Sequence, residues 1–108
     1  MTRSDDFTEH IEKGRKLVES GQLEEAAAEF RKAVSLGADD ARIHEWLGHA
    51  LEELGRHEEA AAEFRKALAR DPESAYAYKR LADVLYELER YDEAEAAYRD
   101  AIRIWPSG

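Results

Sequence analysis

The chain has 108 residues, 38% of them charged and 9% aromatic, and a formal net charge of −9. This length suits one domain with a shared core. The negative charge repels phosphates, so we expect no nucleic acid and no anionic membrane as partner. The lack of cysteine excludes disulfides and thiolate metal sites. No apolar stretch is long enough for a spanning helix or resembles a signal peptide, which predicts a cytoplasmic protein.

One block of sequence occurs three times. The letters EEAAAEFRKA stand at residues 24–33 and again at 58–67, and a looser copy, DEAEAAYRDA, stands at 92–101. The aromatic residue of each copy recurs with a constant step of 34 residues, at Phe30, Phe64 and Tyr98. The chain is therefore predicted to be a single array of three repeats. On this step it divides into a leader, 1–6, and three units, 7–40, 41–74 and 75–108.

Each unit is predicted to contain a helix, a tight turn and a second helix. In the first unit, Gly21 stands where a helix ends in a left-handed residue, and Gly55 holds this place in the second unit. The third unit has Glu89 there instead. A side chain in that conformation costs on the order of 1 kcal/mol, so we expect the third turn to be the most strained of the three.

Apolar residues recur at helical spacing within the units. The middle unit has one stripe on its first helix and another on its second: Leu47, Ala50, Leu51 and Leu54, then Ala60, Phe64, Ala67 and Leu68. Gly48 and Ala60 are predicted to lie where the two helices approach closely, with Phe64 filling the adjacent gap. The position of Gly48 thus requires a small residue.

These residues resemble the tetratricopeptide repeat family. The middle unit matches its pattern at Leu47-Gly48, Leu51, Ala60, Phe64, Ala67 and Pro72, and the third at Leu81-Ala82, Leu85, Tyr91, Ala94, Tyr98, Ala101 and Pro106. The first matches at Gly14, Leu17, Ala26, Phe30 and Ala33, and departs at Lys13 and Ala38. The resemblance implies an all-α fold, a right-handed superhelical solenoid of three antiparallel helix pairs, with six helices.

No catalytic, cofactor or metal site is expected. His10 and His44 hold equivalent positions that face the core, and His49 lies on another face of the helix of His44. Packing or solvation is the simpler role for these histidines, because no carboxylate or cysteine is placed to complete a metal site. A solenoid also offers an open groove rather than an enclosed pocket. We therefore predict that the protein is not an enzyme.

The resemblance implies a scaffold that binds a peptide or helix of a partner protein in a concave groove lined by the first helix of each unit. The groove candidates are Ile11, Arg15, Val18, Glu45, His49, Glu52, Tyr76, Lys79, Arg80, Asp83 and Tyr86. Well-understood members of the family hold a C-terminal carboxylate with Lys, Asn, Asn, Lys and Arg. The matching positions here are Ile11, Arg15, Trp46, Tyr76 and Arg80, and only Arg80 agrees. A chaperone adaptor of that type is therefore not expected. A site for a mixed-charge peptide and an ordinary solvated surface both stay open.

The two ends of the array are predicted to differ. The residues expected to face the preceding unit are apolar in units two and three: Ile43, Ala50 and Leu54, then Ala77, Val84 and Leu88. Their counterparts in unit one are polar, namely Glu9, Lys16 and Ser20, which suits a solvated end.

The last helix is expected to leave an apolar patch formed by Tyr98, Ala101, Ile102, Ile104 and Trp105. Such a patch favours a second function, a structural module that self-associates as a homodimer, or else a piece of a longer array.

Overall fold

A computed structural model describes residues 3–107, with side chains from Phe7 onward. Over this range the chain forms six helices and no strand, as predicted. The helices are α1 (Arg3–Glu19), α2 (Leu23–Ser35), α3 (Ala41–Glu53), α4 (His57–Arg70), α5 (Ala75–Glu87) and α6 (Tyr91–Ile104). Helix α1 thus begins inside the segment expected to be a leader.

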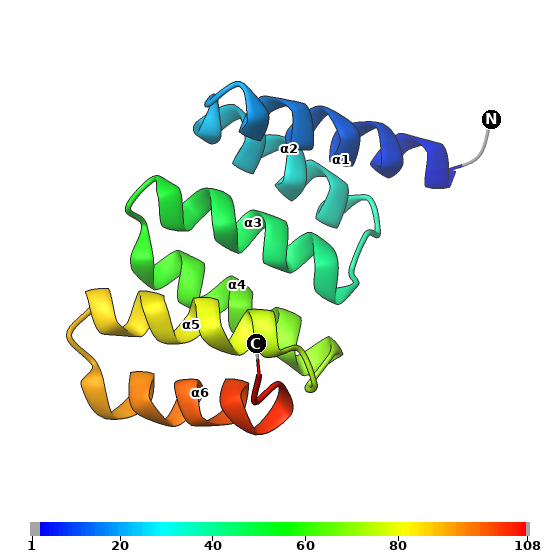
Figure 1. The fold of residues 1–108 in the computed structure, drawn as a ribbon. Coiled ribbons are helices and arrows are strands. Elements are labelled where there is room, and N and C mark those ends of the chain that lie inside the picture. Colours follow the sequence, from blue (N-terminus) through cyan, green and yellow to red (C-terminus); the bar gives the residue numbers. More distant parts are fainter. Residues whose placement is uncertain (1–2, 108) are drawn as a thin grey trace.

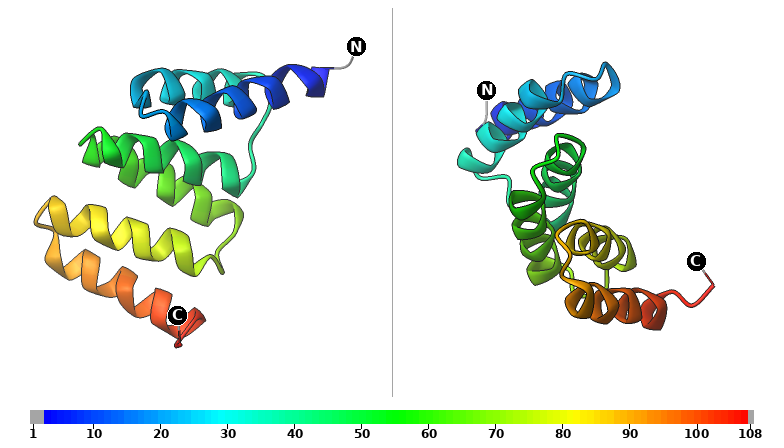
Figure 2. Two further views of the ribbon diagram at one scale, coloured as in Figure 1. Left: turned by 45° about the horizontal axis from the view of Figure 1, so that its top comes forward. Right: turned by 90° about the vertical axis from the view of Figure 1, so that its left-hand side faces the viewer.

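The helices form three antiparallel pairs that stack in chain order (Figure 1). The stack is elongated, with extents of 46 × 25 × 22 Å. Figure 2 shows that α1 and α2 lie at one end of the stack and α6 at the other. Within residues 3–107, the backbone of α6 lies close to that of α5 and of no other helix. Two interfaces therefore join the pairs, and the outer side of α6 has no neighbour among the described helices.

Each pair turns through a residue with positive φ. The angle is 80° at Gly21, 79° at Gly55 and 62° at Glu89, which confirms the prediction for all three turns. The hydrogen bonds agree as well. The amide of Gly55 donates to the Glu52 carbonyl at 3.0 Å, and that of Glu89 donates to the Tyr86 carbonyl at 2.9 Å. Glu89 is the one residue among these that holds this conformation without the freedom of glycine.

The first helix of a unit begins with a side-chain cap where a preceding unit supplies the junction. Asp40 accepts a hydrogen bond from the amide of Ile43 at 3.0 Å, and Ser74 accepts one from the amide of Ala77 at 3.1 Å. These caps satisfy amides that the helix itself leaves free.

Small residues bring the helices of a pair together, as predicted. A Cβ added to Gly48 would lie 3.0 Å from ring atoms of Phe64, and one added to Gly14 would lie 2.6 Å from Phe30. Phe64 and Ala60 have no solvent exposure. Each phenylalanine ring therefore packs directly on the backbone of the facing helix.

The repeated block also supplies ion pairs between neighbouring units. Glu24 pairs with Arg56 at 2.7 Å, and one repeat later Glu58 pairs with Arg90 at 3.2 Å. In the same way, Arg31 pairs with Glu59 at 2.9 Å and Arg65 with Glu93 at 3.2 Å. Exposed pairs contribute less than about 1 kcal/mol each. Their repetition nevertheless explains why the charged residues of the repeated block recur together with its apolar residues.

On the first helices, the predicted difference between unit one and units two and three is confirmed. Ile43, Ala50, Ala77 and Val84 are buried, with at most 1% exposed. Leu54 and Leu88 are half-buried, whereas Glu9, Lys16 and Ser20 are exposed.

The Phe64 contact predicts a large loss of stability on truncation. Phe64→Ala should lower the free energy of unfolding by about 3–5 kcal/mol, because it leaves a cavity against Gly48. Ala60→Leu should lower it by about 1–3 kcal/mol through overpacking. Urea denaturation measures both. The exposed Ala62 is the matched control, and Ala62→Leu should change stability by less than about 0.5 kcal/mol. Equal effects at Ala60 and Ala62 would contradict the packing described.

The third turn predicts a gain in stability. Glu89→Gly should raise the free energy of unfolding by about 0.5–1 kcal/mol, because glycine accepts the positive φ without steric strain. Gly55→Ala should lower it by roughly 1 kcal/mol, since no atom lies within 4 Å of the added Cβ and backbone strain is the only change. Thermal or urea unfolding of both variants tests this. A Glu89→Gly variant less stable than the parent would refute it.

Candidate binding groove

The predicted groove residues do not form one continuous site. They come from α1, α3 and α5, and the structure divides most of them into three groups. The first is a notch around Arg15 and His49, the second is an ion-pair network around Arg80, and the third is an apolar pocket beside Tyr76. Each group offers a different chemistry to a ligand.

The notch lies between α1 and α3. The guanidinium of Arg15 sits 4.9 Å from the centre of the Trp46 ring, a cation–π contact, and the Trp46 ring stacks on Phe30 with centroids 6.1 Å apart. The notch has a volume of about 180 Å³ and is lined by Arg15, Val18, Glu19, Phe30, Trp46 and His49. The Nδ1 atom of His49 is buried and has no hydrogen-bond partner among residues 7–107. A residue that lines the notch therefore holds a buried polar atom without a hydrogen bond, and an aromatic ring lines the same notch.

The network occupies the middle of the groove. Arg80 on α5 reaches back to Glu52 on α3 with an N–O distance of 2.6 Å. The hydrogen bond to Glu52 is the main reason why the pKa of Arg80 is raised. Asp83 lies 3.7 Å from Arg80 and 3.2 Å from Lys79. The charged side chains here already neutralise one another across two units.

The remaining groove candidates have other partners. Ile11 packs against the hydrophobic core, and Glu45 accepts a hydrogen bond from the Ser74 hydroxyl at 2.9 Å. Tyr86 makes an edge-to-face contact with Tyr91, with ring centroids 5.0 Å apart. Glu45 and Ser74 therefore belong to the junction between units two and three.

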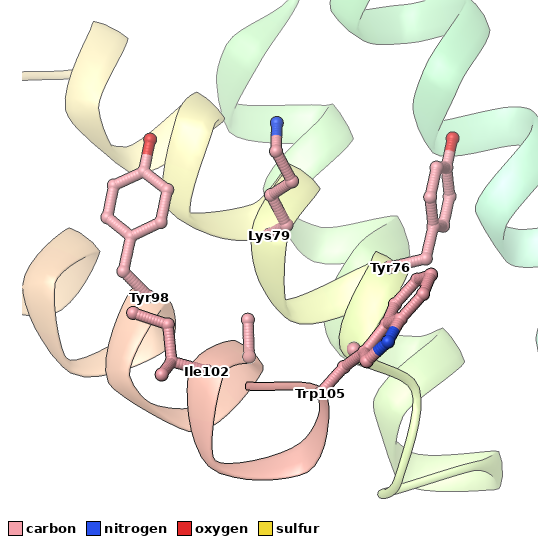
Figure 3. A pocket seen from close by; sticks show the side chains of 7 residues that line it. Tyr76, Lys79, Tyr98, Ile102 and Trp105 are labelled. Carbon is pink, nitrogen blue, oxygen red and sulfur yellow. The ribbon is translucent and has the colours of Figure 1, made fainter. Parts of the chain in front are cut away.

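The pocket lies at the C-terminal end of the array (Figure 3). Its volume is about 310 Å³, and it is lined by Ala75, Tyr76, Lys79, Tyr98, Ala101, Ile102 and Trp105. Ile102 is 61% exposed and Trp105 62% exposed. Four of the five predicted self-association residues line this pocket, whereas Ile104 is half-buried and does not. Sequence reasoning found the apolar residues of α6 but not the cavity that they form with α5.

Tyr98 connects the pocket to the network. Its hydroxyl donates to Asp83 Oδ1 at 2.5 Å. This hydrogen bond, helped by burial and by the negative charge of Asp83, raises the pKa of Tyr98 to about 12. In the first two units a phenylalanine stands at this position, so the bond is specific to the third unit.

The histidines have carboxylate partners that sequence reasoning missed. His44 is buried, as expected, and its Nδ1 and Nε2 atoms each lie 2.7 Å from a carboxylate oxygen, of Glu63 and Asp39 respectively. His10 pairs with Glu29 at 2.6 Å, and this bond lowers the pKa of Glu29. The carboxylates lie on opposite nitrogens of His44 and do not converge. Over the residues that the structure describes, no group of three His, Cys, Asp or Glu side chains could hold a metal ion.

Asp39 extends the His44 contact to the end of α4. It accepts two hydrogen bonds from Arg70, at 2.8 and 2.9 Å. These bonds, followed by the one from His44, lower the pKa of Asp39 to about 2. The arrangement ties the α2–α3 junction to α4 and is structural.

Comparison with known proteins agrees with this architecture. A sequence model of the tetratricopeptide repeat matches residues 11–75 and, in a second register, residues 47–108. The chain belongs to the tetratricopeptide repeat (TPR) family. No curated protein matches the chain significantly. None of the helices in residues 3–107 is long and apolar enough to cross a membrane.

Solved structures of TPR proteins superpose closely. The Arabidopsis OM64 TPR domain is 26% identical with a TM-score of 0.93, and the match covers 99% of this chain and 88% of that one. MamA is 25% identical with a TM-score of 0.90, and the match covers 93% of this chain but 58% of MamA. The first TPR of Spaghetti (RPAP3), bound to the HSP90 peptide SRMEEVD, is 21% identical with a TM-score of 0.91, covering 97% of this chain and 83% of that one.

The hydrogen bond to Asp83 predicts that Tyr98 ionises at an unusually high pH. With a pKa of about 12 against an ordinary 10, the neutral phenol stabilises the folded chain fully below pH 10. This contribution is lost as the pH rises from 10 to 12. NMR titration of the tyrosine rings should show Tyr98 ionising at about pH 12.

Removal of the acceptor provides the test. Asp83→Ala should bring the pKa of Tyr98 down towards 10, because the bond and the negative charge are both lost. Asp92→Ala, at an exposed position of α6, is the control and should leave Tyr98 unchanged. A Tyr98 pKa that does not respond to Asp83→Ala would refute the assignment.

Proposed function

We propose that this TPR array is a protein-interaction scaffold that holds a peptide or helix of a partner protein in its concave groove. The observation that carries the proposal is the notch, in which His49 Nδ1 is buried without a partner beside the Arg15–Trp46 stack. A buried polar atom without a hydrogen bond is costly, and a ligand that supplies one gains affinity. The neighbouring Glu52–Arg80 network offers both signs of charge to the same ligand.

The groove chemistry favours a peptide of mixed charge over a lone carboxylate. Of the five positions expected for a carboxylate clamp, Arg80 alone has the matching residue type, and its charge is already paired with Glu52. Arg15 lies over Trp46 instead. The Spaghetti domain is bound to an HSP90 peptide, but at 21% identity the likeness supports the fold and not the ligand. We therefore do not extend that specificity to this chain.

The same chemistry supports a binding role rather than an enzymatic one. The charged groups of the groove pair with one another, and those around His44 link helices. General acid–base or metal catalysis requires such groups to converge on a substrate.

Self-association through the C-terminal end is the second candidate function. The exposure of Ile102 and Trp105 beside an open cavity favours it, since large apolar residues gathered at one place mark interaction surfaces. A second copy or a helix of another protein could cover this end. The charges there, described below, favour another protein.

Peptide selection tests the scaffold function. Peptides selected on the intact chain from a random phage-displayed library should bind the notch. Arg15→Ala and His49→Ala should each weaken the selected peptides about fivefold or more, because they remove the cation and the buried hydrogen-bonding group.

Lys32→Ala is the matched control, since Lys32 is exposed on α2 and contacts Glu29 at 3.7 Å. It should leave the affinity within about twofold of the parent value. Selected peptides that bind both notch variants as tightly as the parent would remove the notch from the proposal.

A further inference from the structure

The C-terminal pocket occupies the place where an inner unit receives the next helix. One repeat earlier, the equivalent of Tyr98, Ala101 and Ile102 is the set Phe64, Ala67 and Leu68. Helix α5 packs on α4 and α3, which carry that inner surface. Phe64 and Ala67 have no exposure there, whereas Ala101 is half-buried and Ile102 is 61% exposed. The pocket is thus shaped like an acceptor for one more helix.

The charge at this acceptor is reversed. In the inner junction Glu45 accepts a hydrogen bond from Ser74, the residue that begins α5. Lys79 replaces Glu45 in the pocket, and the ion pair that the described residues give it is a largely exposed one with Asp83 at 3.2 Å. Such pairs within a helix are weak and exchange readily. A helix that begins with an acidic residue would form an ion pair with Lys79, which the serine at the start of a helix like α5 could not.

A second pair of positions varies in a matched way. At the first junction Val18 and Trp46 line one notch, and at the second Glu52 and Arg80 form an ion pair. Position 86 continues the series of 18 and 52, and it holds Tyr86, which is 56% exposed. An arginine in a docked helix would have no carboxylate partner at this position, whereas an apolar or aromatic residue could pack on the ring of Tyr86.

We propose that the pocket formed by α5 and α6 docks one amphipathic helix of a partner protein. Its chemistry follows from the two positions. It begins with an acidic residue that meets Lys79, and it carries an apolar residue six positions later that meets Tyr86. An apolar stripe between them covers Ile102 and Trp105. This inference rests on the protein-interaction function proposed above, but it uses the end of the array and not the notch.

A second copy of the chain suits the pocket less well. The outer face of α1 carries Glu9 and Lys16 where α5 buries Ala77 and Val84. Stacking α1 on the pocket would therefore bury charged side chains, which is costly. Copies with a net charge of −9 also repel one another.

The chain itself supplies a matched pair of probes. Residues 40–54 begin with Asp40 and carry Trp46 six positions later, so they satisfy both requirements. Residues 74–88 have Ser74 and Arg80 at these places and satisfy neither. Both probes are synthesised with acetylated and amidated ends, which removes terminal charges.

The test is an NMR titration of the ¹⁵N-labelled intact chain with each peptide. The chain has two tryptophans, so Trp105 reports on the pocket and Trp46 on the notch. The peptide 40–54 should shift the indole signal of Trp105 and leave that of Trp46 in place, and it should bind more tightly than the peptide 74–88. Asp40→Lys in the peptide should weaken binding about two- to fivefold, the value of one exposed ion pair.

A charge exchange makes the test specific. In the Lys79→Glu chain the Asp40→Lys peptide should become the better ligand. Ile102→Lys in the chain should abolish both interactions, while an unchanged Trp46 signal shows that the fold is intact. An unchanged preference in Lys79→Glu, or a Trp105 signal that no peptide moves, would overturn the proposal.

Two further outcomes separate this site from its alternatives. A Trp105 signal that moves when the chain alone is diluted assigns the pocket to a second copy and overturns the proposal. Peptides selected on the notch should be insensitive to Ile102→Lys. Failure of the notch peptides together with a shift of Trp105 by the peptide 40–54 would remove the groove function and keep the pocket.

Discussion

The close approach of the two helices in each unit is the constraint on which the other features depend. A phenylalanine ring packs so closely on a glycine of the facing helix that, in the middle unit, a Cβ added to Gly48 would lie 3.0 Å from ring atoms of Phe64 and the ring would have to shift. This contact fixes how closely the two helices of a unit approach each other. The third unit keeps the geometry with Ala82 and Tyr98 in the same places. There the ring gains a hydroxyl that reaches Asp83, and this links the pocket to the network of the groove.

The junctions combine a constant part with a variable part. On the second helices, the pairs Glu24–Arg56 and Glu58–Arg90 repeat with the same residue types. On the first helices the contact changes, from the apolar notch of Val18 and Trp46 to the ion pair of Glu52 and Arg80. The constant pairs maintain the register of the stack. The variable positions give each junction its own chemistry.

Local features of the fold could be read from the sequence, and long-range pairings could not. The positive φ of Glu89 follows from its alignment with two glycines, and the burial of Ala60 follows from helical periodicity. The pairing of His44 with Glu63 joins residues 19 positions apart on different helices, and it depends on how the side chains orient across the pair. A signal for it did exist. His10 and Glu29 repeat together as His44 and Glu63, and both are lost together in the third unit, as Tyr78 and Ala97. The groove was harder, because a charged stripe does not reveal which charges neutralise one another.

The third unit replaces the histidine and the glutamate of the first two units together, by Tyr78 and Ala97. A buried polar pair is tolerated when both members are present and surrounded, since an unpaired one would be strongly destabilising. His44 meets this condition, because Glu63 and Asp39 occupy both of its nitrogens. In the third unit Ala97 is buried and Tyr78 is half-buried. The first two units thus each join their two helices by a histidine–glutamate pair, whereas the third unit joins α5 and α6 by the Tyr98–Asp83 hydrogen bond.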